Sequence, residues 1–268
     1  MDKLPVFPSV PNVSILLCTA GRSRYFDDCL NSIYQQSFEN WELLICIDGS
    51  DSSVVADREF NDPRVRLFFN SKQMGLAYCL NKLLINAKGQ YVARMDDDDI
   101  MHRDRISEQL KIFQSQDIDV CFSGATLIDE RGHETGYIPK YPSTKNLLNV
   151  ALRNPIIHPS VMFAHEWISK NNYNPIMKKA QDWELWLRTH GATKWYFIPF
   201  PLMYYRVSSK PDYNKRISTC KFQLWAVRTN SVAMGRRLRL LIFSLIFLKK
   251  IYYHILKVCV EKNFGRLN

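Results

Sequence analysis

The sequence predicts an α/β fold with a mainly parallel sheet, followed by a helical tail. Short apolar runs alternate with stretches of helical periodicity, and clusters of polar residues follow several of those runs. The composition, 46% hydrophobic and 23% charged, is that of a globular chain. Its 268 residues can bury one sizeable core. We expect a main domain over residues 1–215 and a separate C-terminal region over residues 216–268.

The first half of the chain contains the alternating elements of the parallel sheet. Continuous apolar runs bounded by turn residues predict buried strands at residues 13–18, 41–47, 65–69 and 91–95. Apolar residues at helical spacing predict intervening helices at residues 24–36, 75–86 and 103–113. Beyond residue 115 the pattern is less regular. We expect strands at 120–122 and 160–163, a loop rich in Gly and Pro through residue 142, and a helix at 181–190.

Polar clusters follow three of the predicted strands, at residues 19–22, 48–51 and 96–99. In parallel sheets of this kind, ligands bind beyond the carboxyl ends of the strands. We therefore expect the three clusters to face one common cleft.

The third cluster consists of four consecutive aspartates, Asp96 to Asp99. Adjacent like charges repel one another and must be solvated, paired or bound to a cation. Oxygen-only ligands favour a hard divalent ion, Mg2+ or Mn2+, over zinc. The alternative is a solvated acidic loop, and it is weakened because apolar sequence resumes at once at Ile100.

Several single residues also suit a nucleotide site. Asp48 suits a hydrogen bond to a base or ribose, or else is a turn residue of Asp-Gly-Ser. Asp182 is expected in the first turn of a helix, where the helix dipole favours any carboxylate. The guanidinium of Arg206 suits phosphate oxygens. Arg22 belongs to the first polar cluster, and Arg94 lies two residues before the third. A Walker-type loop and Gly-x-Gly-x-x-Gly are both missing from the sequence, which disfavours P-loop nucleotidases and Rossmann dehydrogenases.

The cysteines and the N-terminus bear on the cellular compartment. The seven cysteines are scattered without a Cys-x-x-Cys pair, and their number is odd. This pattern indicates reduced thiols, several of them small core residues. The first residues lack the basic start and apolar core of a secretory signal. We therefore expect a cytoplasmic protein.

The C-terminal tail carries most of the net charge of +10. Residues 236–266 contain eight Lys or Arg against one acid, and apolar blocks separate the cations. The blocks are too apolar for a nucleic-acid arm, and the nine-residue run 240–248 is too short to span a bilayer. We expect basic amphipathic helices that lie on the inner face of the cell membrane. The alternative is a C-terminal helix packed on the main domain.

The order of the motifs resembles the family 2 glycosyltransferases of the GT-A fold, a Rossmann-like α/β architecture. The similarity covers residues 13 to about 206. Four segments carry it, at residues 13–19, 42–50, 89–99 and 181–188, which read VSILLCT, ELLICIDGS, GQYVARMDDDD and QDWELWLR. Each segment is weak by itself, but four in order at family-like spacing make a specific match.

The resemblance implies a role for residues at the first three polar clusters. Thr19 and Asp48 would hold the uracil of a UDP-sugar. Asp96 and Asp98 would be the Asp-x-Asp pair, with Asp98 as the main ligand of Mn2+ or Mg2+ and Asp96 or Asp97 near the ribose. Arg22, Arg94 and Arg206 would complete the contacts with the nucleotide-sugar.

The fourth segment implies the catalytic step. Asp182 matches the base that takes the proton from the acceptor hydroxyl as this hydroxyl attacks the anomeric carbon, with inversion of configuration. His158 and Trp183 would line the acceptor side, although core packing also suits both residue types. Two positions depart from the family pattern, because Gln181 and Ile47 stand where the family usually has acids.

Together these expectations describe a metal-dependent inverting enzyme. It would move a hexose from a UDP-sugar to a hydroxyl of a lipid-diphosphate-linked saccharide at the membrane, as in O-antigen and lipopolysaccharide assembly, without binding nucleic acid. Two alternatives stay open. One is a sugar-1-phosphate nucleotidyltransferase, and the other is a non-catalytic membrane-surface binding protein.

Overall fold

The computed structural model describes residues 10–49, 60–138, 146–208, 211–229 and 234–264, with side chains described up to residue 260. The chain forms two compact units that alternate along the sequence. The first comprises Met1–Pro142, Ile156–Asn172 and Thr193–Val207, and the second comprises Ser143–Pro155, Tyr173–Ala192 and Ser208–Asn268. The boundary at residue 215 stays a prediction. Of the second polar cluster, Ser50 and Asp51 lie outside the described residues.

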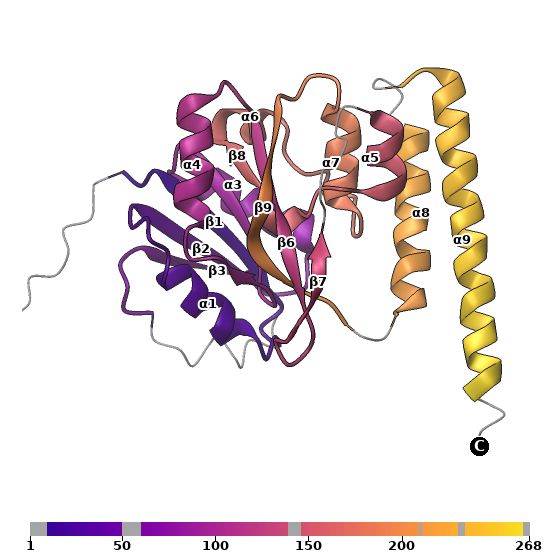
Figure 1. The fold of residues 1–268 in the computed structure, drawn as a ribbon, viewed down its shortest axis with the longest axis horizontal. Coiled ribbons are helices and arrows are strands. Elements are labelled where there is room, and N and C mark those ends of the chain that lie inside the picture. The colour runs from indigo at the N-terminus through magenta and orange to yellow at the C-terminus, as the bar shows by residue number, and fades with distance from the viewer. Residues whose placement is uncertain (1–9, 50–59, 139–145, 209–210, 230–233, 265–268) are drawn as a thin grey trace, which may run out of the picture. The chain divides into compact units, whose positions relative to one another are not determined.

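The first unit is built on a nine-stranded sheet (Figure 1). Its strand order is β3-β2-β1-β4-β8-β6-β9-β5, and β7 pairs with β6. The strands are β1 (Val13–Thr19), β2 (Trp41–Asp48), β3 (Val65–Asn70), β4 (Tyr91–Asp96), β5 (Ile100–Met101), β6 (Val120–Ile128), β7 (Glu134–Ile138), β8 (Met162–Ala164) and β9 (Trp195–Arg206).

The predicted parallel strands form one half of this sheet. β3, β2, β1 and β4 are mutually parallel neighbours, and Cys18 of β1 pairs with Cys46 of β2 and with Asp96 of β4. Beyond β4 the sheet is mixed, because β8 is antiparallel to both β4 and β6 whereas β9 is parallel to β6. The α/β class is confirmed, and its parallel half carries the polar clusters at the strand ends.

Helices cover both faces of the parallel half. Ile15 and Ile45 pack in a core cluster with residues of α1 (Phe26–Tyr34) and α4 (Arg105–Ser115). Successive strand residues point to opposite faces, so Cys46 faces the other side. There Asn70 contacts the sulfur atoms of both Cys46 and Cys79, and Cys79 belongs to α3 (Leu76–Asn86). Burial on both faces explains why these strands are continuous apolar runs.

The loop expected after residue 122 is wrong for residues 123–128 and 134–138. These residues form the rest of β6 and the whole of β7, which pair as an antiparallel hairpin. Gly132, at φ 86°, allows the turn between them. Gly124 leaves room for Tyr137, whose hydroxyl would lie 2.5 Å from any added Cβ. The glycines that suggested a loop are therefore a turn residue and a packing site within a sheet.

The second unit is helical. It contains α5 (Leu147–Arg153), α7 (Gln181–Thr189), α8 (Tyr213–Thr229) and α9 (Arg236–Phe264). Ile242 and Ile246 of α9 are buried in a cluster that includes Cys220 and Val227 of α8, and the two helices lie side by side in Figure 1. Residues 236–264 of the predicted tail thus form one long helix. Of the helices that the structure describes, none is both long and apolar enough to cross a membrane.

Candidate active site

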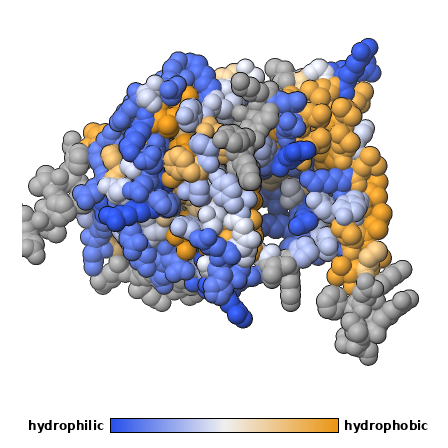
Figure 2. Space-filling model, viewed as in Figure 1, coloured by the Kyte–Doolittle hydropathy of each residue, from blue (hydrophilic) through white to orange (hydrophobic). Residues whose placement is uncertain are grey.

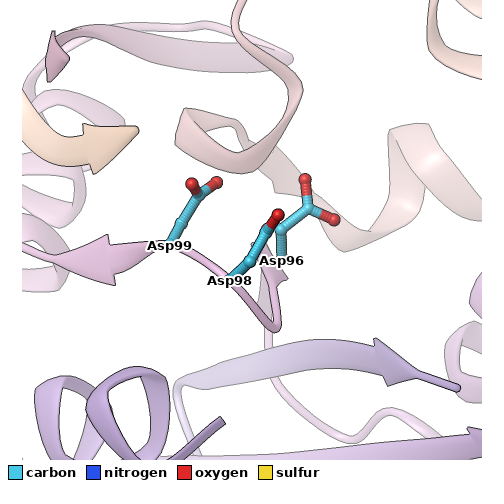
Figure 3. A group of neighbouring side chains, drawn as sticks. All are labelled: Asp96, Asp98 and Asp99. Atoms are coloured by element: carbon cyan, nitrogen blue, oxygen red, sulfur yellow. The ribbon is translucent and has the colours of Figure 1, made fainter. Parts of the chain in front are cut away.

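Three carboxylates meet in the turn that follows β4. Asp96 ends the strand, and oxygen atoms of Asp96, Asp98 and Asp99 lie within 4.8 Å of one another. Figure 3 shows the three side chains extending to the same side of the turn. Asp98 is exposed, Asp96 is half-buried and Asp99 is fully buried. The structure therefore brings the predicted pair together and adds Asp99, which the sequence did not single out.

Asp99 is the most informative of the three. Its Oδ1 accepts a hydrogen bond of 2.8 Å from the backbone N–H of Arg206, whereas its buried Oδ2 has no hydrogen-bond partner among the described residues. Burial, together with the charges of Asp96 and Asp98, raises the pKa of Asp99 well above its ordinary value. A buried carboxylate oxygen without a donor needs a positive partner. A divalent cation with oxygen ligands fits this set of donors.

Asp97 points elsewhere and ties the acidic turn to the end of β1. Its Oδ2 accepts a 2.5 Å hydrogen bond from Thr19 Oγ1, and Thr19 Oγ1 in turn accepts from the backbone N–H of Gly21 at 2.9 Å. Burial raises the pKa of Asp97 to about 6, against the lowering effect of the Thr19 hydrogen bond. Thr19 and Asp97 are thus brought together as a pair, and their contact with a nucleotide stays a prediction.

Two arginines hold the strand that leads into the turn. The buried guanidinium of Arg94 forms an ion pair with Asp96. Arg105, on α4, is completely buried, and its Nη2 donates to the carbonyl oxygens of Arg94 at 3.0 Å and Val161 at 3.1 Å. Arg105 therefore anchors β4 from within the core, through the carbonyl group of Arg94. Sequence reasoning missed it because an arginine at helical spacing reads as a solvent-exposed position.

Arg206, the last residue of β9, braces the acidic turn. Its Nε donates to Asp98 O at 2.9 Å, its Nη1 donates to Asp129 O at 2.8 Å, and its guanidinium carbon lies 3.8 Å from the centroid of the Tyr25 ring. The side chain is 5% exposed. Through these contacts Arg206 stabilises the turn. Its contact with a diphosphate stays a prediction. Arg22 is exposed just after β1.

Asp48 lies at the end of β2 and accepts three hydrogen bonds. The donors are the backbone N–H groups of Met74 at 2.8 Å and Gly75 at 2.7 Å, and Asn70 Nδ2 at 2.9 Å. Burial would raise the pKa of Asp48, but these hydrogen bonds outweigh burial and lower it. Gly75, at φ 94°, precedes α3. Asp48 is therefore ionised and fixed at the carboxyl edge of the sheet.

His158 is a buried residue of the short helix η1 (His158–Ser160) in the first unit. Burial lowers its pKa well below the ordinary value, and the charge of Arg94 acts in the same direction. His158 is therefore a neutral imidazole at physiological pH. Its place on the acceptor side stays a prediction.

Asp182 and Trp183 belong to the first turn of α7 in the second unit. The indole of Trp183 is buried in the helical core and donates a 2.8 Å hydrogen bond to Ala151 O, at the end of α5. Asp182 is half-buried, and its Oδ2 accepts a 3.2 Å hydrogen bond from Asn154 Nδ2. Asn154 was not predicted, although an Asn-Pro pair directly after a helix is a sequence signal for a helix end.

Known proteins resemble this chain in sequence. The model of Glycosyl transferase family 2 matches residues 14–171. Similar proteins include the O-antigen biosynthesis glycosyltransferase WbnJ of Escherichia coli, 27% identical over 208 residues that cover 74% of this chain and 80% of WbnJ. The glucosyltransferase WfgD of the same species, named UDP-Glc:alpha-D-GlcNAc-diphosphoundecaprenol beta-1,3-glucosyltransferase, is 25% identical over 60% of this chain and 66% of its own.

Two kinds of solved structure share the fold. The S. aureus protein TarS, residues 1–349 in complex with UDP, has a TM-score of 0.63 at 15% identity and covers 88% of this chain and 70% of its own. The mannosyltransferase PcManGT of Pyrobaculum calidifontis, in complex with GDP-Man and Mn2+, has a TM-score of 0.63 at 14% identity and covers 94% and 74%. The predicted GT-A architecture is confirmed.

Proposed function

Since this chain belongs to glycosyl transferase family 2, we propose that it transfers a hexose from a UDP-sugar to a hydroxyl of a lipid-diphosphate-linked saccharide, with inversion, in bacterial surface polysaccharide synthesis. The observation that carries this proposal is the carboxylate cluster after β4, in which Asp99 presents a buried oxygen that lacks a donor among the described residues. Asp48 and Thr19 stand at the same edge of the sheet, Thr19 at the end of β1, which pairs with β4, and Asp48 at the end of β2, which pairs with β1.

The donor half of the reaction needs a site for a base, a ribose and a diphosphate. In the proposal, ionised Asp48 accepts from the uracil or ribose, and the Thr19–Asp97 pair closes that side of the site. Asp96, Asp98 and Asp99 hold Mn2+ or Mg2+, and when bound, the ion supplies the positive charge that a leaving diphosphate requires. Arg94 keeps Asp96 oriented through its ion pair.

The acceptor half of the reaction needs a base. In the proposal, the Asp182 carboxylate accepts the proton of the acceptor hydroxyl while the hydroxyl oxygen bonds to the anomeric carbon and the bond to the UDP oxygen breaks. The helix dipole favours the ionised form of a carboxylate in the first turn of α7. His158, neutral and buried, is proposed to shape the acceptor side rather than to transfer protons.

The choice of donor and acceptor class rests on relatives. The name of WfgD gives UDP-glucose as its donor and a GlcNAc-diphosphoundecaprenol as its acceptor, and WbnJ is named for O-antigen biosynthesis. We carry over the class of the WfgD substrates, a UDP-hexose and a saccharide on a lipid diphosphate, and not the particular sugars.

The outer face of α9 supports action at a membrane surface. We use this name for the exposed apolar residues Leu240, Leu241, Phe243, Phe247, Leu248, Ile251, Tyr252, Ile255, Val258 and Val260. The apolar surface along α9 is visible in Figure 2. From residue 240 to residue 260 no exposed position is Lys, Arg, Asp or Glu, while Lys249, Lys250 and Lys257 are half-buried. A helix with this pattern can lie in the interface of an anionic bilayer, with its lysines near the headgroups.

A double substitution on this face tests the membrane contact. Phe247→Glu with Ile251→Glu places two charges in the apolar face and should reduce co-sedimentation with phosphatidylglycerol vesicles at least about tenfold, because burying each apolar side chain contributes about 1.5–3 kcal/mol. Ile85→Glu, at an 85% exposed position on α3, is the matched control and should change nothing. Unchanged sedimentation of the double variant would assign the outer face to something other than lipid.

The donor site is tested by thermal stabilisation of the purified protein. We expect UDP with Mn2+ to raise the melting temperature more than dTDP, GDP or CMP does, since a ligand at a hundredfold excess over its Kd adds about 2.7 kcal/mol to stability. The Asp98→Ala variant should lose the effect of Mn2+. UDP release from UDP-glucose, UDP-galactose or UDP-GlcNAc in the presence of a synthetic GlcNAc-diphospholipid then identifies the reaction.

Two other results would replace the proposal. Release of pyrophosphate from UTP and a sugar 1-phosphate would identify a nucleotidyltransferase. No stabilisation by any nucleotide, with vesicle binding intact, would identify a non-catalytic membrane-surface protein.

A further inference from the structure

Backbone strain in the second unit is concentrated around Asp182. Among the described residues, two that are not glycine have a positive φ, Asn154 at 42° and Ala180 at 57°. Asn154 is the C-cap residue directly after α5, and Ala180 precedes α7 by one residue and Asp182 by two. Left-handed backbone at non-glycine residues is unfavourable and tends to cluster at functional sites. The two strained positions therefore mark the neighbourhood of this carboxylate.

Two hydrogen bonds join this part of α7 to the end of α5. The indole of Trp183 donates to Ala151 O at 2.8 Å, and the amide of Asn154 donates to Asp182 Oδ2 at 3.2 Å. Asp182 and Trp183 are adjacent residues of α7. Their partners are Ala151 in the last turn of α5 and Asn154, the C-cap residue of that helix. The Trp183 bond fixes the spacing of the two helices, and the Asn154 bond fixes the Asp182 carboxylate itself.

The chemistry of the Asn154 amide sets its orientation. A carboxylate accepts hydrogen bonds, so the NH2 end of the amide must face Asp182. The other end, Oδ1, is buried without a hydrogen-bond partner among the described residues. A buried side-chain amide usually has hydrogen-bond partners for both its NH2 group and its oxygen. In Asn154 the NH2 group bonds to Asp182 while the oxygen has no partner among the described residues, which indicates that the side chain is oriented by Asp182.

We propose that Asn154 is a positioning residue for Asp182, which holds the carboxylate in one rotamer and favours its ionised form through the Nδ2 hydrogen bond. The inference rests on the proposed function, in which Asp182 is the base. A hydrogen bond to the charged form of an acid keeps that acid ionised to lower pH. Asn154 thus moves the lower pH limit of activity to lower pH.

The test separates the amide from the backbone conformation. Asn154→Gly removes the amide and keeps a residue that tolerates positive φ, whereas Asn154→Ala removes the amide and adds strain. Both variants should lower kcat about tenfold to a hundredfold and should move the acid limb of the pH–rate profile to higher pH by about one unit. They should differ in melting temperature, with Asn154→Ala the lower. Asn154→Asp, which replaces the donor with a like charge, should move the acid limb furthest.

The readout is UDP release from the UDP-hexose identified above, measured from about pH 5 to pH 9. If Asn154→Gly keeps the wild-type acid limb while Asp182→Asn is inactive, Asn154 only caps α5 and the inference fails while the proposed function stands. If Asp182→Asn keeps its activity, the assignment of the base fails, and with it the role of Asn154.

Discussion

Replacing Asp182 with Asn should lower kcat for glycosyl transfer by about 10²- to 10⁴-fold, the usual contribution of a general base. Asn has the same shape as Asp but cannot accept a proton, and its side-chain oxygen can still accept the Asn154 hydrogen bond of 3.2 Å. The fold of α7 should therefore be unchanged. The affinity for UDP with Mn2+ should also be unchanged, because the proposed donor site lies in the other unit of the chain.

The measurement is single-turnover transfer together with a UDP binding isotherm. Glu184→Gln is the matched control, since Glu184 is a carboxylate of the same helix that is buried in an ion pair with Arg188 at 3.1 Å. We expect this control to lower the melting temperature and to keep kcat within a few-fold of wild type. A kcat of Asp182→Asn above a tenth of the wild-type value would show that another group takes the proton.

The sequence was informative where structure depends on short segments. The strands β1, β2 and β4 were predicted within about two residues, because burial on both faces makes each a continuous apolar run. Asp96 and Asp98 were placed at the edge of the sheet because they follow such a run directly. The hairpin of β6 and β7 was missed, since its glycines Gly124 and Gly132 serve packing and a turn.

Contacts between distant parts of the chain could not be predicted in this way. Asp99 looks like one more acid of the run, but it is buried and accepts a hydrogen bond from the N–H of Arg206, 107 residues further along. The role proposed for Asn154 follows only from its hydrogen bond to Asp182, 28 residues away. The lysines of α9 suggested a cationic surface, whereas packing on α8 leaves apolar residues such as Phe247 and Ile251 exposed and Lys249 half-buried. In each case the role of the side chain depends on the residue that it contacts in the folded chain, which its residue type does not reveal.

Replacing Asp99 with Asn should raise the thermal stability of the metal-free protein and lower that of the protein with Mn2+ and UDP. Without metal, the new amide would keep an oxygen for the N–H of Arg206 and would present an NH2 group, in place of the unpaired Oδ2, to the carboxylates of Asp96 and Asp98. This replaces a buried acid, whose ionisation is opposed by burial and by the carboxylates within 4.8 Å, with a neutral group. We expect the melting temperature of the metal-free protein to rise, since burying an uncompensated charge is strongly unfavourable.

With Mn2+ and UDP the same substitution should weaken the binding of the metal nucleotide and the stabilisation that it gives, because an oxygen ligand of the metal is lost. If the affinity for the metal nucleotide falls about a hundredfold, a ligand concentration that adds about 2.7 kcal/mol to the wild type adds only about 0.4 kcal/mol to the variant. Asp119→Asn is the matched control, as Asp119 also accepts a backbone N–H, from Lys194 at 2.8 Å, and is not in the cluster. It should keep the effect of Mn2+. The prediction fails if Asp99→Asn lowers the stability of the metal-free protein while the response to Mn2+ stays at the wild-type level, because Asp99 would then serve the fold through Arg206 and not the metal.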